Sequence, residues 1–321
     1  VIRITNVQKG FVEDTNPQYY PVSEQREIEK YMLCEGDLLM SLTGNVGRVG
    51  LLSAEMLPAA LNQRVACIRI RNPAVIYKPF LFHLLNSDYF ENKCILASQG
   101  VAQKNMSTEW LKEYPIPSFS MDKQMEIASI FDKIDDLIAR RKEQVRNMDQ
   151  AVKSRFIELF GDCDLTHPQE SWVTIKEIGS VVGGATPKTD HDEYWGGSYR
   201  WITPAELDAD SGYIYDSVRK LTKAGVESCS LQEMPVGTVI LSSRAPIGKV
   251  AIAGNTFYCN QGFKNIICKE GITPRYLYTV LLLNVEYLNS LGRGATFKEI
   301  SKGIVESIRI PVPSMELQEQ F

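Results

Sequence analysis

Two stretches of the sequence share one pattern and decide the fold. The first is GDLLMSLTGNVGRVGLL, residues 36–52, and the second is GTVILSSRAPIGKVAIA, residues 237–253. Each starts with glycine, continues through apolar or small residues, breaks at a short polar loop, and resumes with glycine, a basic residue and valine. Short apolar runs on both sides of a polar loop are typical of a β-hairpin. The chain therefore carries the same hairpin-like segment twice.

The repeat extends well beyond this segment, and the matching pieces keep a constant order. The pairs are Ile4-Thr5 with Ile202-Thr203, Asn62-Gln63 with Asn260-Gln261, Phe80-Leu81-Phe82 with Tyr276-Leu277-Tyr278, SQGVAQKNMS (98–107) with GRGATFKEIS (292–301), PIPS (115–118) with PVPS (311–314), and Gln124 with Gln320. The spacing is far longer than the 20–45 residues or so of a solenoid repeat. We therefore expect two copies of a whole domain, with insertions and deletions in the loops.

The two copies differ at their ends. Residues 171–198 have no counterpart before Val1, so we expect the first copy to lack its N-terminal segment. The last residues, 314–321, repeat the beginning of the segment that follows the first copy, so a second long helix is expected to be largely missing. The expected boundaries are 1–118 for the first domain, 119–160 for a linking helix, 161–313 for the second domain and 314–321 for the start of the second helix.

The linking segment, residues 121–160, contains neither glycine nor proline, and its apolar residues recur every three or four positions. This spacing predicts one apolar stripe along a helix of roughly 60 Å, starting at Ser118 or Ser120 as N-cap and ending at Gly161. A helix this long with a narrow stripe needs a partner helix, and the natural partner is the antiparallel helix of the second repeat. The residues expected to pack against a partner are Ile127, Ile130, Ile134, Leu137, Ile138, Val145, Met148 and Val152.

Each copy is expected to have an α+β fold. The segments KVAIA (249–253), SVRKL (217–221) and TVILSS (238–243) are short, rich in β-branched residues and bounded by turn residues, which predicts strands. The segments KPFLFHLLNSDYF (78–90) and PRYLYTVLLLNVEYL (274–288) are predicted to be amphipathic helices whose aromatic residues pack in the core. The overall prediction is two similar mixed domains joined by a long helix, as a pseudo-twofold repeat.

Composition narrows the class of protein. The chain has 321 residues, 44% hydrophobic and 23% charged, which suits two soluble domains. Its net charge of −4 argues against a protein that coats nucleic acid non-specifically. No apolar run is long enough for a membrane helix. Seven cysteines without metal-ligand spacing are expected to be buried reduced thiols, and no metal or cofactor is expected.

The polar loops between the expected elements are rich in residue types that bind phosphates and base edges. In the first copy these candidates are Thr43, Asn45, Arg48, Gln63, Arg64, Gln103 and Lys104. In the second copy they are Thr186, Lys188, Arg244, Lys249, Gln261, Lys264, Arg293, Thr296 and Lys298. The framework residues repeat between the copies while the loop residues differ, for example TGNV against RAPI. This contrast favours two readers of different targets built on one scaffold.

No catalytic motif supports an enzyme. Gly248-Lys249 lacks the rest of a P-loop, and GNVGRVG lacks the dinucleotide-binding spacing. Three scattered histidines give no assignable catalytic triad. Glu91 and Lys93 beside Asp88 resemble part of a nuclease motif, but a surface helix end is the simpler interpretation.

One set of motifs resembles the specificity subunit of Type I restriction-modification systems. The set comprises GGATP (183–187), WIT (201–203), SSRAPIGKV (242–250), NQGF (260–263), GATFKEIS (294–301), IPVP (310–313) and SRFIELFGD (154–162). The resemblance covers nearly the whole chain. It implies two target-recognition domains, each reading one half of a bipartite site in double-stranded DNA, separated by an antiparallel pair of spacer helices.

The resemblance also implies partners and a location. The partners would be two DNA methyltransferase subunits and, in the larger complex, the restriction and translocase subunits, in the cytoplasm of a bacterium or archaeon. The specificity subunit itself would be non-catalytic. Arg48 and Lys249, at equivalent positions, are then expected to contact phosphates rather than bases. Two alternatives stay open: a repeated-domain coiled-coil adaptor that binds protein and not DNA, and an enzyme.

Overall fold

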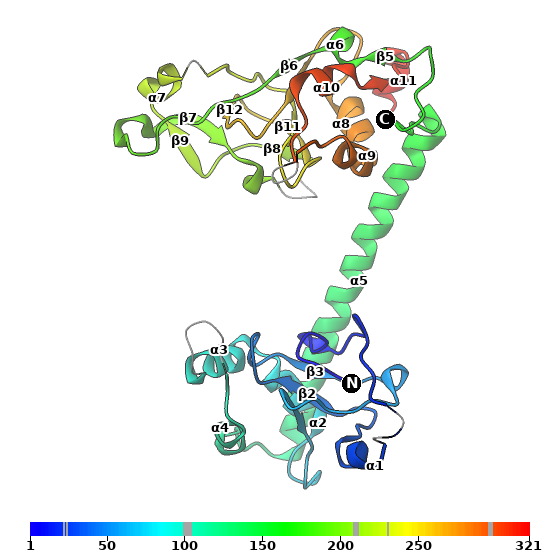
Figure 1. Cartoon of the computed structure of the whole chain (residues 1–321), viewed down its shortest axis with the longest axis vertical. Coiled ribbons are helices and arrows are strands. Elements are labelled where there is room, and N and C mark those ends of the chain that lie inside the picture. Colours follow the sequence, from blue (N-terminus) through cyan, green and yellow to red (C-terminus); the bar gives the residue numbers. More distant parts are fainter. Residues whose placement is uncertain (22, 24, 99–104, 208–211, 230, 295–297) are drawn as a thin grey trace. The chain divides into compact units, whose positions relative to one another are not determined.

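The chain consists of two compact units, described here from a computed structural model (Figure 1). Unit 1 is Val1–Gln144 and unit 2 is Val145–Phe321. The structure describes residues 1–21, 23, 25–98, 105–207, 212–229, 231–294 and 298–321.

Unit 1 is built on a four-stranded sheet of order β1-β3-β2-β4. Strands β2 and β3 are antiparallel, as are β2 and β4, whereas β1 runs parallel to β3. The strands are β1 (Gly10–Phe11), β2 (Leu38–Ser41), β3 (Val49–Leu51) and β4 (Val65–Ile68). The helices are α1 (Gln25–Ile28), α2 (Lys78–Leu85), α3 (Asp88–Ala97) and α4 (Thr108–Glu113), with the 3-10 turns η2 (Glu29–Tyr31) and η3 (Ala54–Met56).

Alternation along β2 divides the core of unit 1 into two parts. Leu38 and Met40 point to the helical side, where they pack with Leu81 of α2 and Phe90 of α3. Leu39 points to the other side, into a cluster formed by the N-terminal residues and the loops. Since neighbouring side chains of a strand face opposite ways, a strand buried on both faces has the continuous apolar sequence seen here.

The described residues of unit 2 form three sheets and a helical layer. Its strands are β5 (Val173–Thr174), β6 (Gly179–Val182), β7 (Trp195–Ile202), β8 (Tyr213–Ile214), β9 (Arg219–Leu221), β10 (Val239–Leu241), β11 (Val250–Ala253), β12 (Tyr258–Cys259), β13 (Asn265–Cys268) and β14 (Arg309–Ile310). Its helices are α6 (Ile175–Ile178), α7 (Lys223–Ser228), α8 (Pro274–Leu283), α9 (Val285–Ser290), α10 (Lys302–Ser307) and α11 (Met315–Glu319), with η4 (Asp192–Tyr194) and η5 (Pro204–Glu206).

The main sheet of unit 2 repeats that of unit 1. Its order is β6-β13-β10-β11-β8, and the last four strands correspond to β4-β2-β3-β1, with the same mixture of directions. Strand β6 is the addition, pairing antiparallel with β13. It lies in the segment that was expected to have no counterpart in the first copy. Two small sheets, β12-β7-β9 and β14-β5, complete unit 2. The predicted α+β class and the repeat are both confirmed.

Three of the pairings made from sequence need correction. Asn62 donates its amide to the Ile2 carbonyl at 3.2 Å, and Asn260 does the same to Ile202 at 3.2 Å, so Ile2 and not Ile4 matches Ile202. The buried glutamine that matches Gln124 is Gln318 and not Gln320. In both places a similar residue recurs two positions away, as Ile2 and Ile4 or Gln318 and Gln320, and the residue types alone do not fix the hydrogen-bond register.

The same two-residue shift applies to the two proline-containing segments, one before the long helix that begins at Met121 and one before α11. Ser120 accepts from the Lys123 amide at 3.3 Å, and Ser314 accepts from the Leu317 amide at 3.4 Å. Ser120 therefore matches Ser314, and PIPS (115–118) is displaced by two residues from PVPS (311–314).

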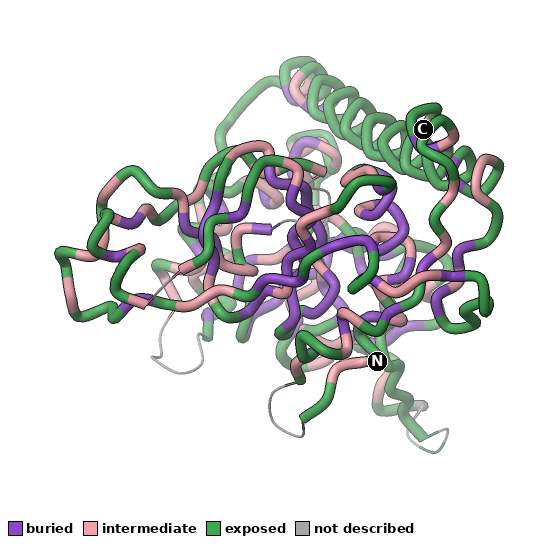
Figure 2. The backbone as a smooth tube through the Cα atoms, turned by 90° about the horizontal axis from the view of Figure 1, so that it is seen from above, coloured by how far each residue is buried: buried purple, intermediate pink, exposed green. Residues whose placement is uncertain are grey.

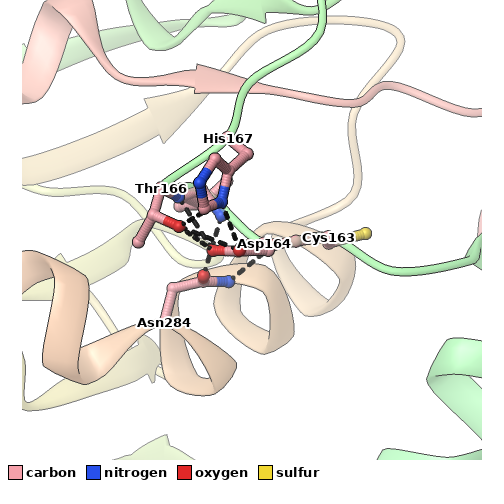
Figure 3. A network of polar contacts seen from close by, with 6 residues as sticks. Cys163, Asp164, Thr166, His167 and Asn284 are labelled. Carbon is pink, nitrogen blue, oxygen red and sulfur yellow. Dashed lines mark hydrogen bonds and ion pairs between the residues drawn. The ribbon is translucent and has the colours of Figure 1, made fainter.

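The two predicted amphipathic helices are each broken in the middle. α2 ends before Asn86 and α3 begins at Asp88, while α8 and α9 are separated by Asn284. Figure 3 shows the reason in unit 2: Asn284 turns its side chain to the segment after the long helix. Its Oδ1 accepts from the Leu165 amide at 3.0 Å, and its Nδ2 donates to the Cys163 carbonyl at 2.9 Å.

Beside Asn284, a small polar turn fixes the same segment (Figure 3). Thr166 and His167 both bond to Asp164, with Thr166 Oγ1 at 2.7 Å from Oδ1 and His167 Nδ1 at 2.9 Å from Oδ2. The hydrogen bonds from His167 and Thr166 lower the pKa of Asp164 to about 2. The turn thereby holds the chain as it leaves the long helix against α8.

The long helix α5 spans Met121–Phe160, as the sequence predicts. Ser120 is its N-cap, and Gly161 follows it with a left-handed φ of 76°. Figure 2 shows most of its length as exposed, in contrast to the buried strands. Phe156, near its C-terminal end, is fully buried and packs with Tyr276 of α8 at a ring-centroid distance of 5.5 Å.

Candidate nucleic-acid interface

The polar loop of the repeated hairpin has the same internal bond in both units. In unit 2 the Ser242 hydroxyl donates to the Pro246 carbonyl at 2.8 Å. In unit 1 the Ser41 hydroxyl donates to the Asn45 carbonyl. Each loop is therefore closed by a buried serine, which is Ser41 as the last residue of β2 in unit 1 and Ser242 directly after β10 in unit 2.

A glycine at the end of each loop is required by the backbone. Gly47 has φ of 91° and Gly248 has φ of 88°, a region that residues with a side chain rarely adopt. A Cβ on Gly47 would lie 2.8 Å from Cβ of Cys94, and one on Gly248 would lie 3.0 Å from Cγ1 of Val285. The loop of unit 1 therefore packs closely against α3, and the loop of unit 2 packs closely against α9.

The tips of the two loops present different chemistry at the same place. In unit 1, Thr43 forms an isolated β-bridge with Asn105, and its hydroxyl donates to Asn105 Oδ1 at 2.8 Å. In unit 2, Arg244 forms the equivalent bridge with Glu299, and its Nε donates to Glu299 Oε2 at 2.9 Å. The scaffold thus offers a neutral pair in unit 1, with Thr43 buried and Asn105 exposed, and a half-exposed charged pair in unit 2.

Glu299 is shared by two cations. Besides Arg244, the Lys264 ammonium lies 3.1 Å from Glu299 Oε1 and 3.4 Å from Ser243 Oγ. Burial of Glu299 works against ionisation, but the hydrogen bonds from Lys264 and Arg244 outweigh it and hold the pKa of this carboxyl below its usual value. Arg293 joins through its backbone, which exchanges two hydrogen bonds with Glu299, at 3.1 and 3.0 Å. The cluster carries two positive side chains against one negative.

A second polar pair adjoins this cluster. Thr186, in the loop after β6, donates its hydroxyl to Gln261 Oε1 at 2.7 Å, and both residues are exposed. The loop is held by the Ala185 amide, which donates to the Cys259 carbonyl at 3.0 Å. Lys188 and Lys298 are also exposed. The candidates of unit 2 that the structure describes therefore come from four segments that hydrogen bonds link together.

Arg48 and Lys249 occupy equivalent positions but use their charged ends within their own units. Arg48 Nη1 donates to Gln8 Oε1 at 2.9 Å. Lys249 Nζ donates to the carbonyls of Leu207 at 2.5 Å and Pro204 at 3.3 Å. Arg48 thus holds the segment after Ile2 against the hairpin of unit 1. Lys249 holds the segment after Ile202 against the hairpin of unit 2. This geometry favours a role in positioning the loops over direct phosphate contact.

The remaining candidates of unit 1 are Asn45, Gln63 and Arg64, and all three are exposed. Gln103, Lys104 and Thr296 lie outside the described residues. Sequence reasoning missed Glu299 and Arg3. Glu299 could have been found by aligning FKEIS with QKNMS, which places it opposite Asn105.

The cysteines are all unpaired thiols, as expected, but they are not all buried. Cys94, Cys163 and Cys259 are buried, Cys67, Cys229 and Cys268 are partly buried, and Cys34 is exposed. Burial raises the pKa of Cys259 and Cys268 to about 12, which disfavours the nucleophilic thiolate. No group of three potential metal ligands occurs within the described ranges.

The apolar stripe of α5 is uncovered over most of its length. Exposed fractions are 49% for Ile130, 43% for Ile134, 60% for Leu137, 48% for Ile138, 56% for Val145, 66% for Met148 and 50% for Val152. Ile127, in the second turn, is partly buried. These side chains form an exposed apolar row along the helix, and its packing against a partner helix stays a prediction.

The chain belongs to the family of Type I restriction modification DNA specificity domains. The family model matches residues 5–147 and 170–321, which are the two copies of the repeat.

Particular relatives agree with this assignment. The Type I restriction enzyme MjaIX specificity subunit of Methanocaldococcus jannaschii is 44% identical over 176 residues, which cover 53% of this chain and 40% of that protein. The putative Type I restriction enzyme MjaX specificity subunit of the same organism is 26% identical over 341 residues, covering 99% of this chain and 77% of that protein. This chain therefore spans well under two thirds of the first of these relatives.

The fold has a counterpart among solved structures. The crystal structure of the Type I restriction-modification system S subunit from M. genitalium superimposes with a TM-score of 0.50 at 17% identity, covering 91% of this chain and 75% of that one. Among the helices that the structure describes, none has the length and apolar character needed to cross a membrane.

Proposed function

We propose that this chain recognises double-stranded DNA as the specificity component of a Type I restriction-modification system. Each unit would read one half of a bipartite target. The loop residues at the tips of the two hairpins would supply the contacts, and α5 would set the gap between the two half-sites.

One observation carries the proposal. The two units share strand order, loop closure and glycine positions, yet Thr43 with Asn105 stands where Arg244 with Glu299 stands in the other copy. A repeated framework that served only for packing would have no need of such a difference at its exposed tips. Two copies that read two different base sequences require one, since neutral hydroxyl and amide groups and charged guanidinium groups prefer different base edges.

Local charge supports DNA contact in spite of the acidic chain. In the described part of the second interface, Arg244 and Lys264 share one carboxylate, and the neighbouring loops add the exposed side chains of Lys188 and Lys298. Arginine and lysine are the side chains that bind phosphates and guanine, and positive loops on an otherwise acidic protein allow binding without general affinity for nucleic acid. Acidic surfaces elsewhere are free to face partner subunits.

The exposed stripe of α5 supports a role in assembly. A helix of 40 residues with seven apolar side chains at least 43% exposed has a surface suited to another helix. We assign this surface to a second spacer helix and to the docking of two methyltransferase subunits. Methyl transfer and DNA cleavage would then be carried out on other subunits, including the restriction and translocase subunits of the full complex.

Exchange of one reader tests the proposal. Replacing residues 161–313 with the equivalent domain of another specificity subunit should change one half of the methylated motif and leave the other half intact. Mapping of modified bases in cells that carry the hybrid is the measurement. A change in both halves, or in neither, would contradict the modular assignment.

A further inference from the structure

Unit 1 contains a small polar cavity that is absent from the expectations drawn from sequence. It lies where the first residues of the chain meet the turn before β4, and its volume is about 280 Å³. The lining residues are Arg3, Ile4, Thr5, Asn62, Gln63 and Arg64.

Backbone hydrogen bonds hold the walls of this cavity in place. The Asn62 amide donates to the Ile2 carbonyl at 3.2 Å, which joins the two walls. The Asn62 side chain accepts from the Arg64 amide at 3.1 Å and closes a tight turn. On the other side, the Arg3 amide donates to Asn6 Oδ1 at 2.9 Å. The cavity is therefore preformed, because each wall is fixed by bonds that do not involve the charged ends of its side chains.

The cavity is lined by cations and has no carboxylate among its six lining residues. Arg3 Nη2 donates to the Asn16 carbonyl at 2.6 Å, while its Nε is buried without a hydrogen-bond partner among the described residues. The exposed Arg64 guanidinium likewise has no partner within the described part of the chain. Burial withdraws the Nε of Arg3 from a ligand, so an anion in the cavity would meet the Nη groups of Arg3 and the exposed guanidinium of Arg64.

The second copy shows that the framework does not need these cations. At the equivalent positions, Thr203 replaces Arg3 and Gly262 replaces Arg64. Thr203 satisfies itself locally, with its amide donating to Glu206 Oε1 at 2.9 Å. The two arginines are therefore a feature of unit 1 alone and call for an explanation outside folding.

We propose that this cavity binds a phosphate of the DNA backbone, with Arg3 and Arg64 as its ligands. The assignment rests on the proposed function, since it deepens the description of how unit 1 contacts its half-site. Two guanidiniums offer several N–H donors to one anionic group, a geometry that suits phosphate. An extruded base would need aromatic or broad apolar faces to stack on, and no lining residue is aromatic.

The salt dependence of DNA binding tests this proposal. The protein, with the subunits that purify with it, is titrated with a duplex carrying its methylated motif at several salt concentrations. Each phosphate contact removed should lower the slope of log K against log salt by about 0.9. We expect Arg64→Gln to lower the slope by that amount, and to weaken binding by the same factor on the motif and on a duplex with an altered first half-site.

Two Arg3 variants and a control at Arg71 are compared with Arg64→Gln. Arg3→Lys keeps a charge but loses the second donor direction and should retain most of the slope, whereas Arg3→Gln should reduce it. Arg64→Gln guards against misfolding of an Arg3 variant, because the Arg64 side chain is exposed and unpartnered among the described residues. Arg71→Gln is the matched control, since Arg71 is exposed beyond the opposite end of β4 and should leave the slope unchanged.

The possible outcomes separate this proposal from the wider function. If the unsubstituted protein binds its motif with normal salt dependence but both arginine variants match it, the phosphate assignment is wrong and the function stands. A loss confined to one base sequence would assign the cavity to base reading and overturn the proposal. Line broadening of inorganic phosphate in ³¹P NMR that depends on Arg64, with an unchanged DNA slope, would assign it to a free anion. Absence of any salt-dependent DNA binding would overturn both.

Discussion

Gln124 and Gln318 make the same three hydrogen bonds in the two units. Gln124 Oε1 accepts from the Tyr77 amide at 2.8 Å, and Gln318 Oε1 accepts from the Thr273 amide at 2.8 Å. Gln124 Nε2 donates to the carbonyls of Val75, before α2, and Phe119, before α5. Gln318 Nε2 donates to the carbonyls of Gly271, before α8, and Pro313, before α11. A buried glutamine in the first turn thus ties the start of α5 and of α11 to its unit.

Loss of this side chain should destabilise one unit selectively. Gln318→Ala leaves a buried amide and two carbonyls without partners, and we expect it to lower the free energy of unfolding by about 1–3 kcal/mol. Trp110 is the only tryptophan of unit 1, so in a Trp110→Phe background the fluorescence reports unit 2 alone. Urea denaturation in that background is the measurement, and an equal loss in both units would contradict the local role.

Arg244 should contribute to one half-site only. Arg244→Ala is expected to weaken binding to DNA that carries the second half-site by about 1–3 kcal/mol if the guanidinium is bidentate to guanine. The loss should vanish on a duplex in which that half-site is scrambled. Thr43→Ala is the matched variant at the equivalent position and should affect the other half-site. Unchanged affinity in electrophoretic or fluorescence titration would remove Arg244 from the interface.

The charge cluster around Glu299 should make unit 2 sensitive to acid. Because the folded pKa of Glu299 is lowered from 4.5, its contribution to stability is fully present above that value and is lost as pH falls through the folded pKa. Glu299→Gln should therefore cost stability at neutral pH and cost progressively less as the pH falls below 4.5. Thermal unfolding of both proteins across this range measures the difference, and a constant difference at all pH values would refute the assignment.

The stripe of α5 should matter for assembly and not for folding. Ile134→Ser combined with Ile138→Ser should abolish co-purification of partner subunits or pairing with a second helix. Since these side chains are already 43% and 48% exposed, thermal unfolding by circular dichroism should change little, by about 0.5 kcal/mol or less. Glu143→Ser, on the face of the helix opposite Ile134, serves as control. Loss of domain folding would show that the stripe packs within the chain.

The sequence was most informative where a pattern was long or repeated. The absence of glycine and proline over residues 121–160 predicted the extent of α5, with its N-cap left open between Ser118 and Ser120, and the repeated hairpin identified equivalent strands. Register was harder to predict, because Ile2 and Gln318 were displaced by two positions when similar letters were matched. Helix breaks at Asn86 and Asn284 were missed, since an asparagine inside an apolar pattern does not reveal what its side chain bonds: Asn86 bonds the Phe82 carbonyl one turn earlier, and Asn284 bonds the distant residues Cys163 and Leu165.

The individual roles of polar side chains were the least predictable part of the site. Arg48 and Lys249 have the residue type of phosphate ligands, yet their charged ends are occupied by Gln8 and by the carbonyls of Pro204 and Leu207. Arg3 looked unremarkable in sequence, because only the folded backbone brings it beside Arg64. Composition indicates which groups are available, whereas the fold decides which of them remain free to bind.

The edge strand β6 bears on how such genes exchange segments in evolution. Val181 and Val182 pair with β13, and Val173 in β5 pairs with Ile310 in β14. If one crossover falls at Gly161, directly after α5, and the other follows Ile310, both strands of each of these pairs come from the same parent. A crossover at Gly183 would give β6 and β13 different ancestry, so viable hybrids should cluster their upstream junctions near the end of the long helix.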